Sequence, residues 1–153
     1  MRIVLQRVSS AAVTTDNRIL GKIGKGLLVL LGVASDDTYE IADKMIDKIK
    51  SLRIFADQNG KTNLSSVDIC GEILVVSQFT LYADCRKGNR PGFTNAAEPG
   101  YANNMYNYFI DKCRGNFKDV QHGEFGADMS VSLVNDGPFT LVLDSVMWKE
   151  ARR

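Results

Sequence analysis

The continuous apolar run Ile73-Leu74-Val75-Val76, which ends abruptly in the polar segment Ser77-Gln78-Phe79-Thr80-Leu81, most constrains the fold. A short run that is this apolar and rich in β-branched residues predicts a buried strand. The polar side chains would then stand at the end of a rigid element. Ser77, Gln78 and Thr80 carry no charge, so they suit orienting a substrate or a water better than exchanging protons near neutral pH. The alternative is that the hydroxyl groups of Ser77 and Thr80 only satisfy backbone groups at the strand end.

A second segment, Asn135-Asp136-Gly137-Pro138-Phe139-Thr140, lies between two runs, 129–134 and 139–144, in which apolar and polar residues alternate over most of their length. This pattern predicts two antiparallel strands joined by a hairpin at 135–138. Gly137 permits backbone angles that other residues avoid, while Pro138 fixes its own φ and lacks an N–H donor. The Gly137–Pro138 peptide is a candidate for a cis bond, and an ordinary trans turn is the alternative.

The other segments alternate in type. Strand-like runs are expected at 2–8, 10–15 and 26–34 and around 71–82, with two or three further strands near the end of the chain. No internal repeat or low-complexity linker separates them. The pattern indicates a mixed α+β fold, and the spacing does not determine its topology.

Two segments, near 37–50 and near 99–114, have helical spacing. Asp37 and Glu40 have the spacing of a capping box in the first segment, and Pro99 stands close to the start of the second. The stripe predicted to be buried in the first helix comprises Ile41, Met45, Ile49 and Leu52. The inner face predicted for the second helix comprises Tyr101, Met105, Tyr108 and Phe109, and these aromatic side chains fit a core better than a base-stacking platform.

The length and charge of the chain set further bounds. With 153 residues and 44% hydrophobic content, residues 1–153 are expected to form one domain with a substantial core. Nineteen basic and eighteen acidic residues give a net charge of +1, which argues against a general polyanion binder, and no DNA binding is expected. Any attraction to nucleic acid must therefore be local. The best candidate cluster is Arg86, Lys87 and Arg90, for which a solvated loop is the alternative; Lys149, Arg152 and Arg153 form a weaker patch.

Cys70, Cys85 and Cys113 are odd in number and lack C-x-x-C spacing, which argues against a disulfide framework and a zinc site. No metal and no cofactor are expected. A reducing compartment fits this cysteine usage. Because no cleavable signal and no apolar run of about 18 residues is present, no membrane association is expected, and the predicted location is cytoplasmic.

Motifs along essentially the whole chain resemble the D-aminoacyl-tRNA deacylases of the bacterial and eukaryotic type. Besides the two segments described above, the resemblance includes Gln6-Arg7-Val8, 26–33, Leu52-Arg53-Ile54-Phe55, Lys61-Thr62-Asn63-Leu64, Arg86-Lys87-Gly88-Asn89-Arg90-Pro91 and Phe125-Gly126-Ala127-Asp128-Met129. The sequence departs from the family pattern at Thr62, where Met is expected, and at Gly92, where Ser is usual. Neither departure falls in the two main segments, so only local contacts are in doubt.

This resemblance implies hydrolysis of the ester that joins a D-amino acid, or glycine, to the terminal ribose of tRNA, which is a chiral proofreading step. It also implies two stacked β-sheets with the helices on one side, a three-layer β/β/α arrangement. The implied assembly is a homodimer with active sites at the subunit interface. There, the backbone carbonyls of a cis Gly137–Pro138 would enter the partner's site and block an L side chain. Phe79 would line the pocket, and Phe125 and Met129 are implied as walls of the terminal adenosine pocket.

Catalysis admits two interpretations. Thr80 could be a nucleophile, but no histidine, lysine or carboxylate lies beside it in sequence to act as a base. His122, in the loop-like Gln121-His122-Gly123, is predicted to be an exposed surface residue. We therefore interpret the segment from Ser77 to Thr80 as a substrate-positioning shell for a water, with Thr80 as the runner-up nucleophile. The family resemblance implies that the substrate's 2′-hydroxyl also takes an active part.

Three functional classes stay open at this point. The leading one is a hydrolase of D-aminoacyl-tRNA. The second is a related proofreader with a trans Gly-Pro that acts on another mischarged tRNA. The third is a noncatalytic RNA-binding dimer whose motifs serve only folding.

Overall fold

A curved six-stranded sheet with two helices on one face forms the centre of the computed structural model, which describes residues 1–149. The sheet has the order β2-β1-β3-β6-β7, and β8 pairs with the other edge of β1. The β3–β6 and β6–β7 pairs are parallel, and the remaining pairs of this sheet are antiparallel. Its strands are β1 (Arg2–Thr15), β2 (Arg18–Ile23), β3 (Gly26–Gly32), β6 (Glu72–Ser77), β7 (Asp119–His122) and β8 (Ser130–Asp144).

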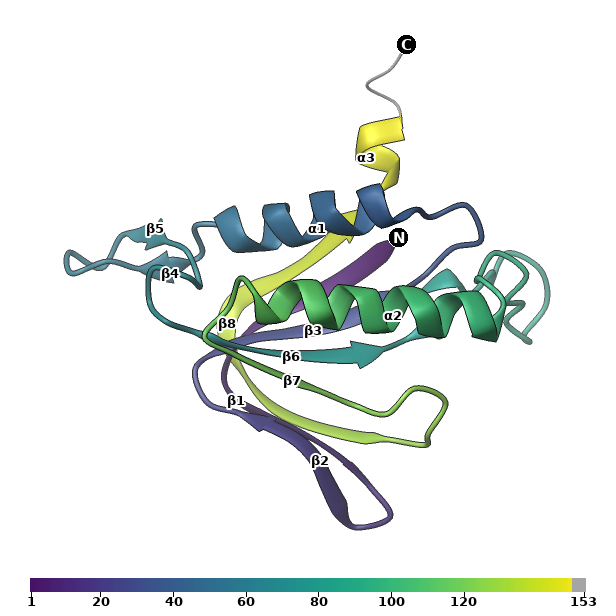
Figure 1. Ribbon diagram of the computed structural model, residues 1–153, viewed down its shortest axis with the longest axis horizontal. Helices are drawn as coiled ribbons and strands as arrows, with labels where there is room; N and C mark the ends of the chain where they lie inside the picture. Colours follow the sequence, from purple (N-terminus) through teal and green to yellow (C-terminus); the bar gives the residue numbers. More distant parts are fainter. Residues whose placement is uncertain (150–153) are drawn as a thin grey trace.

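The helices α1 (Tyr39–Ser51) and α2 (Pro99–Arg114) lie side by side over the sheet, while β2 and the far halves of β1 and β8 curl beneath it (Figure 1). A small two-stranded sheet stands at one end of the molecule. The remaining elements are the strands β4 (Phe55–Ala56) and β5 (Thr62–Leu64), the 3-10 helix η1 (Phe79–Tyr82) and the short helix α3 (Val146–Lys149). None of the helices among residues 1–149 is both long and apolar enough to cross a membrane.

Two separate hydrophobic clusters hold the layers of the fold together, one between the helices and the sheet and one between the stacked parts of the sheet. In β3, Leu27, Val29 and Leu31 pack in the cluster beneath the helices, whereas Leu28 packs in the second cluster, between the stacked parts of the sheet. Strands that are buried on both faces read as unbroken apolar runs, and this is the pattern that predicted them. The α+β class with stacked β layers and helices on one side is thus confirmed. The two β layers are halves of one hydrogen-bonded sheet, continuous through β1 and β8.

The predicted strand boundaries need three corrections. The runs 2–8 and 10–15 form the single strand β1. The strand expected around 71–82 ends at Ser77, and the 3-10 helix η1 begins at Phe79. The hairpin predicted at 135–138 is wrong, because the residues on both sides of it belong to one strand, β8, which extends from Ser130 to Asp144. Both of its halves pair with β1, and the residues that resembled a hairpin turn are an outward bulge of the strand.

The second helix begins and ends where the sequence predicted, but the predicted cap of the first is wrong. Helix α1 begins after Thr38, whose hydroxyl accepts a hydrogen bond from the backbone N–H of Ile41 at 3.3 Å. Asp37 does not take part in a capping box because its carboxylate binds elsewhere. The buried face of α2 includes the predicted Met105 and Phe109, while the predicted Tyr101 and Tyr108 are half-buried at its border.

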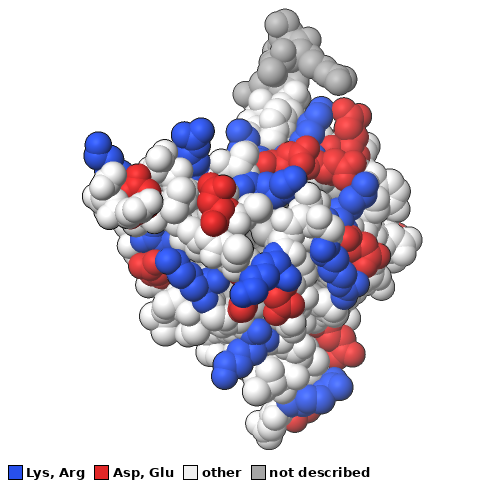
Figure 2. All heavy atoms as spheres, turned by 60° about the vertical axis from the view of Figure 1, so that its left-hand side comes forward, with Lys and Arg blue, Asp and Glu red and all other residues white. Residues whose placement is uncertain are grey.

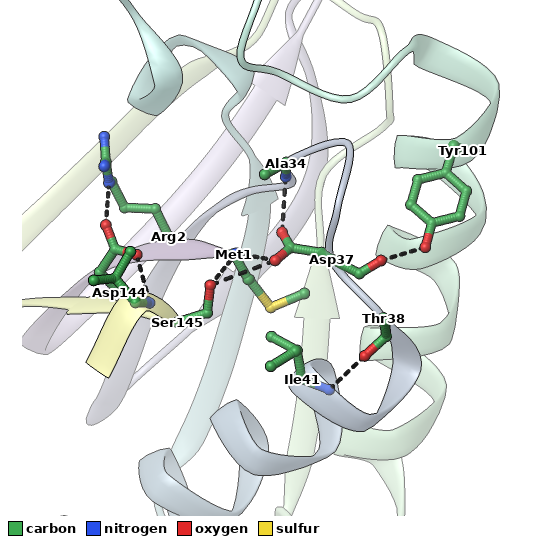
Figure 3. Close-up of polar contacts among 10 residues, drawn as sticks. Met1, Arg2, Ala34, Asp37, Thr38, Ile41, Tyr101, Asp144 and Ser145 are labelled. Atoms are coloured by element: carbon green, nitrogen blue, oxygen red, sulfur yellow. Dashed lines mark hydrogen bonds and ion pairs between the residues drawn. The ribbon is translucent and has the colours of Figure 1, made fainter. Parts of the chain in front are cut away.

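Asp37 instead joins four parts of the chain (Figure 3). Its fully buried carboxylate pairs with the amino group of Met1 and accepts a hydrogen bond from the backbone N–H of Ala34 at 2.7 Å. The Met1 amino group also donates to the Ser145 hydroxyl at 2.7 Å, and the Tyr101 hydroxyl donates to the Asp37 carbonyl. This network, the Asp37 cluster, connects the start of β1, the end of β8, the β3–α1 turn and α2.

We predict that Asp37→Ala destabilises the protein strongly, because it leaves the amino group of Met1 buried without its carboxylate partner. Loss of one partner of a buried ion pair costs about 3–5 kcal/mol. The free energy of unfolding in urea measures this effect. Asp47→Ala is the matched control, because Asp47 is an exposed aspartate of the adjacent helix α1, and it is expected to change stability by less than about 0.5 kcal/mol. Equal effects of the two substitutions would contradict the role given to the Asp37 cluster.

Candidate functional site

The polar segment that follows β6 stands at the end of a rigid element, as the sequence predicted. β6 lies between β3 and β7, and its residues from Ile73 to Val76 are buried. The backbone N–H of Gln78 donates to the carbonyl of Leu31 at 2.8 Å, which ties the turn to the end of β3. A Cβ on Gly32 would lie 3.1 Å from the Gln78 carbonyl oxygen and from Leu81 Cβ. The glycine therefore lets this turn pack closely against β3.

A pocket of about 320 Å³ with aromatic walls opens on one side of this segment. Phe79 packs edge-on against Phe93, with ring centroids 5.0 Å apart, and Tyr106 lies 5.9 Å from Phe125. We call this hollow the aromatic pocket. It suits a planar apolar group such as a nucleobase or an aromatic side chain. Its walls are completed by Leu31, Val33, Ser77, Gln78, Ala96, Ala97, Pro99, Ala102 and Gly126.

Tyr106 serves as a wall of the aromatic pocket and not as an acid. Its hydroxyl lies 3.0 Å from the carbonyl oxygen of Val75 and 3.2 Å from that of Gly123, to which it donates. Burial raises the pKa of Tyr106 far above its ordinary value, so the hydroxyl stays protonated. The side chain consequently links α2 to the ends of β6 and β7 without taking part in proton exchange.

A second hollow, of about 240 Å³, lies on the other side of the same segment. Ser77, Gln78 and Phe79 line both hollows, as does Gly126. Met129 lines the second hollow, whereas Phe125 lines the first. The structure therefore brings five predicted site residues together around the end of β6, namely Ser77, Gln78, Phe79, Phe125 and Met129.

Thr80 and His122 occupy different positions from these five. Thr80 is exposed and is not among the residues that line either hollow, and its hydroxyl accepts a hydrogen bond from the Gln78 amide at 2.5 Å. The loop predicted around His122 is wrong, because His122 is the last residue of β7. It is half-buried, with Nδ1 2.7 Å from the Gly123 carbonyl oxygen. Among the lining residues, only Asp128 and Tyr106 carry an ionisable side chain.

The chemistry open to this arrangement follows from its groups. Neutral hydroxyl and amide groups beside an aromatic pocket can hold a planar group and orient a water or a substrate hydroxyl. Among residues 1–149, no group of three or more His, Cys, Asp or Glu side chains could hold a metal ion. The three cysteines are free thiols, and burial raises the pKa of Cys113 to about 12, so this thiol stays protonated and inert.

The second predicted segment forms a tip that protrudes from β8. Gln6 pairs with Thr140 and Val8 with Asn135, so the four residues 136–139 lie opposite Arg7 alone. We call residues 136–139 the tip. The peptide between Gly137 and Pro138 is cis. Both residues are exposed, and neither is among the residues that line the two hollows of this chain.

Arg7 holds the tip from the side of the sheet. Its guanidinium donates to the carbonyl oxygens of Asp136 at 3.0 Å and Gly137 at 2.9 Å, and also to that of Ile54. The same group lies 3.1 Å from the Asp136 carboxylate and over the Phe139 ring. Only 11% of the Arg7 side chain is exposed, so the guanidinium is held by the sheet, while its contact with Gly137 lies at the surface. The orientation of the tip carbonyls is thereby fixed within one subunit.

The predicted basic residues gather in a loop. Arg86, Lys87 and Arg90 line a third hollow, of about 490 Å³. This hollow is lined by residues of the same loop that supplies Phe93 to the aromatic pocket. Of the second basic patch, Arg152 and Arg153 lie outside the described residues.

Three residues of the site received no role from the sequence patterns. Tyr106 follows the predicted core residue Met105 and lies on the same buried face of α2, so the helical spacing held a signal for it. Arg7 is a charged residue within an apolar strand, which was a second signal. Phe93 lies in an irregular loop, where no periodic pattern could identify it as a pocket wall.

Comparisons with known proteins agree over nearly the whole chain. Residues 4–144 match the family model described as D-Tyr-tRNA(Tyr) deacylase. A D-aminoacyl-tRNA deacylase of Clostridioides difficile (strain 630) is 60% identical over 145 residues, which are 95% of this chain and 97% of the relative. A D-aminoacyl-tRNA deacylase of Thermosipho melanesiensis is 56% identical over 146 residues, again 95% of this chain and 97% of the relative.

Two solved structures have a similar fold. One is the c-Myc DNA Unwinding Element Binding Protein, with a TM-score of 0.89 and 41% identity over 94% of this chain and 98% of that chain. The other is a probable eukaryotic D-amino acid tRNA deacylase, with a TM-score of 0.77 over 93% of this chain and 97% of that chain. The second is only 18% identical, so it supports the fold alone.

Proposed function

This chain belongs to the D-Tyr-tRNA(Tyr) deacylase family, and from this premise we propose how its site selects and cleaves its substrate. As a D-aminoacyl-tRNA deacylase it is a hydrolase of a carboxylic ester, and aminoacylated tRNA is its substrate. The products are the free D-amino acid and a tRNA that can be charged again. The observation that carries the proposal is the rigid tip at Gly137–Pro138, held by Arg7 outside the pocket of its own subunit.

Rejection of the wrong hand needs a rigid obstacle. Two enantiomers contain the same atoms, and graded apolar contact separates similar side chains by only about 1–3 kcal/mol. The tip provides the obstacle, because Arg7 fixes its carbonyl oxygens and Gly137 adds no side chain. An L side chain would meet these carbonyls, whereas a D side chain points away from them. Achiral glycine passes the same filter, so glycyl-tRNA is expected to be cleaved as well.

The tip acts in the partner subunit of a homodimer. Within one subunit, Gly137 and Pro138 do not line the hollows around Ser77 and Phe79. β8 also presents apolar side chains to solvent, with Val134 58% and Val142 65% exposed. Among the described residues, β8 pairs with β1 alone, so its outer edge is open. An open, apolar edge strand is suited to association with a second copy, and such an association would bring each active site to the subunit interface.

The proposed chemistry relies on positioning. An aminoacyl ester is already activated toward water, so oriented donors and a held water are sufficient. Ser77 and Gln78 provide neutral polar groups that border both hollows. There, Phe79 and Phe125 in the aromatic pocket and Met129 in the second hollow hold the terminal adenosine and the aminoacyl group. The 2′-hydroxyl of the terminal ribose takes part in the reaction. Thr80, which lies outside both hollows, positions the Gln78 amide and is not the nucleophile.

The basic loop of Arg86, Lys87 and Arg90 attracts the tRNA. Acidic and basic side chains are interspersed on the face drawn in Figure 2, so a single-sign field does not cover that face. One relative, 41% identical, is described as a DNA unwinding element binding protein, and that description applies to that protein. We expect no DNA binding here, because the net charge is only +1. The cytoplasmic location stays a prediction that fits a substrate used in translation.

We predict that Thr80→Val lowers the deacylation rate by no more than about tenfold. Its hydroxyl makes one neutral hydrogen bond to Gln78, and such a bond contributes only about 0.5–1.5 kcal/mol, so kcat should stay within about tenfold of the wild type. Single-turnover hydrolysis of D-tyrosyl-tRNA measures this rate. Gln78→Ala, which changes a residue that lines both hollows, should reduce the rate more. A loss with Thr80→Val that approaches complete inactivation would restore Thr80 as the nucleophile.

We predict that a tip variant and a pocket variant complement each other in a mixed dimer. Gly137→Val should add a side chain that obstructs the pocket the tip enters, so that the D ester is also excluded. It should not disturb its own subunit, since the nearest atom to a Cβ at Gly137 lies 3.9 Å away. Phe79→Ala removes a wall of both hollows. If the tip acts in the partner's pocket, the mixed dimer has one intact site and about half of the wild-type activity on D-tyrosyl-tRNA.

Each variant alone serves as the control and should be nearly inactive. With the tip acting in its own subunit, every site of the mixed dimer would contain one defective element. A mixed dimer as inactive as its parents would therefore contradict the cross-subunit arrangement, as would a monomer with full activity after dilution.

A further inference from the structure

We propose that the hollow lined by Arg86, Lys87 and Arg90, here called the basic hollow, is a phosphodiester subsite for the acceptor strand of tRNA. It would hold the phosphates that immediately precede the terminal adenosine. This inference rests on the proposed deacylase function and adds to it the path by which the nucleic acid leaves the pocket. Four features of the loop support it.

The first feature is that the loop is closed at its base. Asp84 and Gly92 form an antiparallel bridge, in which the Asp84 N–H donates to the Gly92 carbonyl at 2.7 Å and the Gly92 N–H donates back at 3.0 Å. Gly88 has a φ of +65°, a conformation that L side chains rarely adopt. The basic side chains are thus carried by a short loop with fixed ends.

The second feature is the distribution of charge in the basic hollow. Arg86 forms a bidentate pair with Asp84, at 2.8 Å from Nε to Oδ1 and 2.7 Å from Nη2 to Oδ2. Its hydrogen bonds lower the pKa of Asp84 to about 2, so this carboxylate stays ionised and offsets one positive charge. Among residues 1–149, the side chains of Lys87 and Arg90 have no ion-pair partner. Two cations therefore stay available to an anionic ligand.

The third feature is the position of the basic hollow beside the aromatic pocket. Gly92 and Thr94 line the basic hollow, while Phe93 between them lines the aromatic pocket and packs against Phe79. One short stretch of chain therefore separates a site for a planar apolar group from a site for anions. A nucleotide strand has these two properties in adjacent positions, because each base is followed along the strand by a phosphate. The Thr94 hydroxyl adds a donor of the kind that contacts phosphate oxygens.

The fourth feature is the contrast with the other large hollow of this region, of about 860 Å³. Its charged lining residues are two arginines and three aspartates, which together give it a negative balance: Arg2, Arg86, Asp36, Asp84 and Asp144. A phosphate backbone would be repelled there. The basic hollow has three cations and one carboxylate, so the geometry assigns the backbone to this hollow.

The experiment compares substrates that differ in their phosphates. The variant is the double substitution Lys87→Ala with Arg90→Ala. The substrates are D-tyrosyl-adenosine, which has no phosphate, the D-tyrosyl ester of the trinucleotide CCA, and D-tyrosyl-tRNA. Each removed charge should contribute about a tenfold loss. The double variant should therefore lower kcat/KM on the CCA ester about a hundredfold more than on D-tyrosyl-adenosine, and the additional loss on D-tyrosyl-tRNA should be the same.

Salt dependence provides a second readout. For the wild type, log kcat/KM on the CCA ester should fall with log salt, and the double variant should show a slope shallower by about 1.4, since each phosphate contact on a single strand contributes roughly 0.7. Lys61→Ala is the matched control, because Lys61 is an exposed lysine in the β4–β5 turn, and it should change neither quantity. Lys87→Arg with Arg90→Lys should restore most of the activity, because both charges return.

Failure of the proposed subsite and failure of the proposed function would give different results. An equal loss on all three substrates would overturn the subsite, since the loop would then support the pocket itself. A loss on D-tyrosyl-tRNA alone would also overturn it, because the contact would lie with the tRNA body. If the wild type cleaved none of the esters, the proposed function would fail. The subsite is then decided by binding of uncharged CCA: weaker binding by the double variant supports it, and unchanged binding overturns it.

Discussion

The pairing of β8 with β1 over nearly the whole length of both strands is the constraint on which the rest of the structure depends. It joins the two β layers, because β1 contributes Leu5 to the cluster beneath the helices and Val13 to the cluster between the layers. Its register is interrupted where four residues of β8 lie opposite Arg7. Extra residues in one strand must leave the ladder, and here they form the tip. The side chain that faces the interruption holds the carbonyl oxygens of the tip.

The site combines two structural elements of different origin. The parallel strands β3, β6 and β7 place Ser77 and Phe79 at a common edge, where α2 and the loop through Phe93 complete the aromatic pocket. The tip comes from β8 and does not line that pocket in its own subunit. Binding and chiral rejection are thus assigned to different surfaces, which a homodimer would bring together. In the proposed phosphodiester subsite, the basic hollow would extend the pocket toward the nucleic acid.

The sequence predicted the elements better than it predicted their connections. The apolar runs of β3 and β6 and the Pro99 start of α2 carry strong local signals, and these elements lie where they were expected. The alternation around Gly137 is the same for a hairpin and for a bulged strand, so only the pairing with β1 decides between them. Asp37 has capping-box spacing, but its carboxylate binds the amino group of Met1, a partner distant in sequence. Phe93 and the position of the tip depend on the tertiary arrangement, which local patterns do not contain.

Release of free tyrosine from matched D- and L-tyrosyl-tRNA is the measurement that tests the central claim most directly. The two substrates differ only in the hand of one carbon, so any difference in rate reports the chiral filter and not affinity for tRNA. The purified protein is expected to release tyrosine from the D ester and to leave the L ester intact. Equal release from both esters would contradict the role of the Gly137–Pro138 tip, and release from neither would contradict the deacylase mechanism.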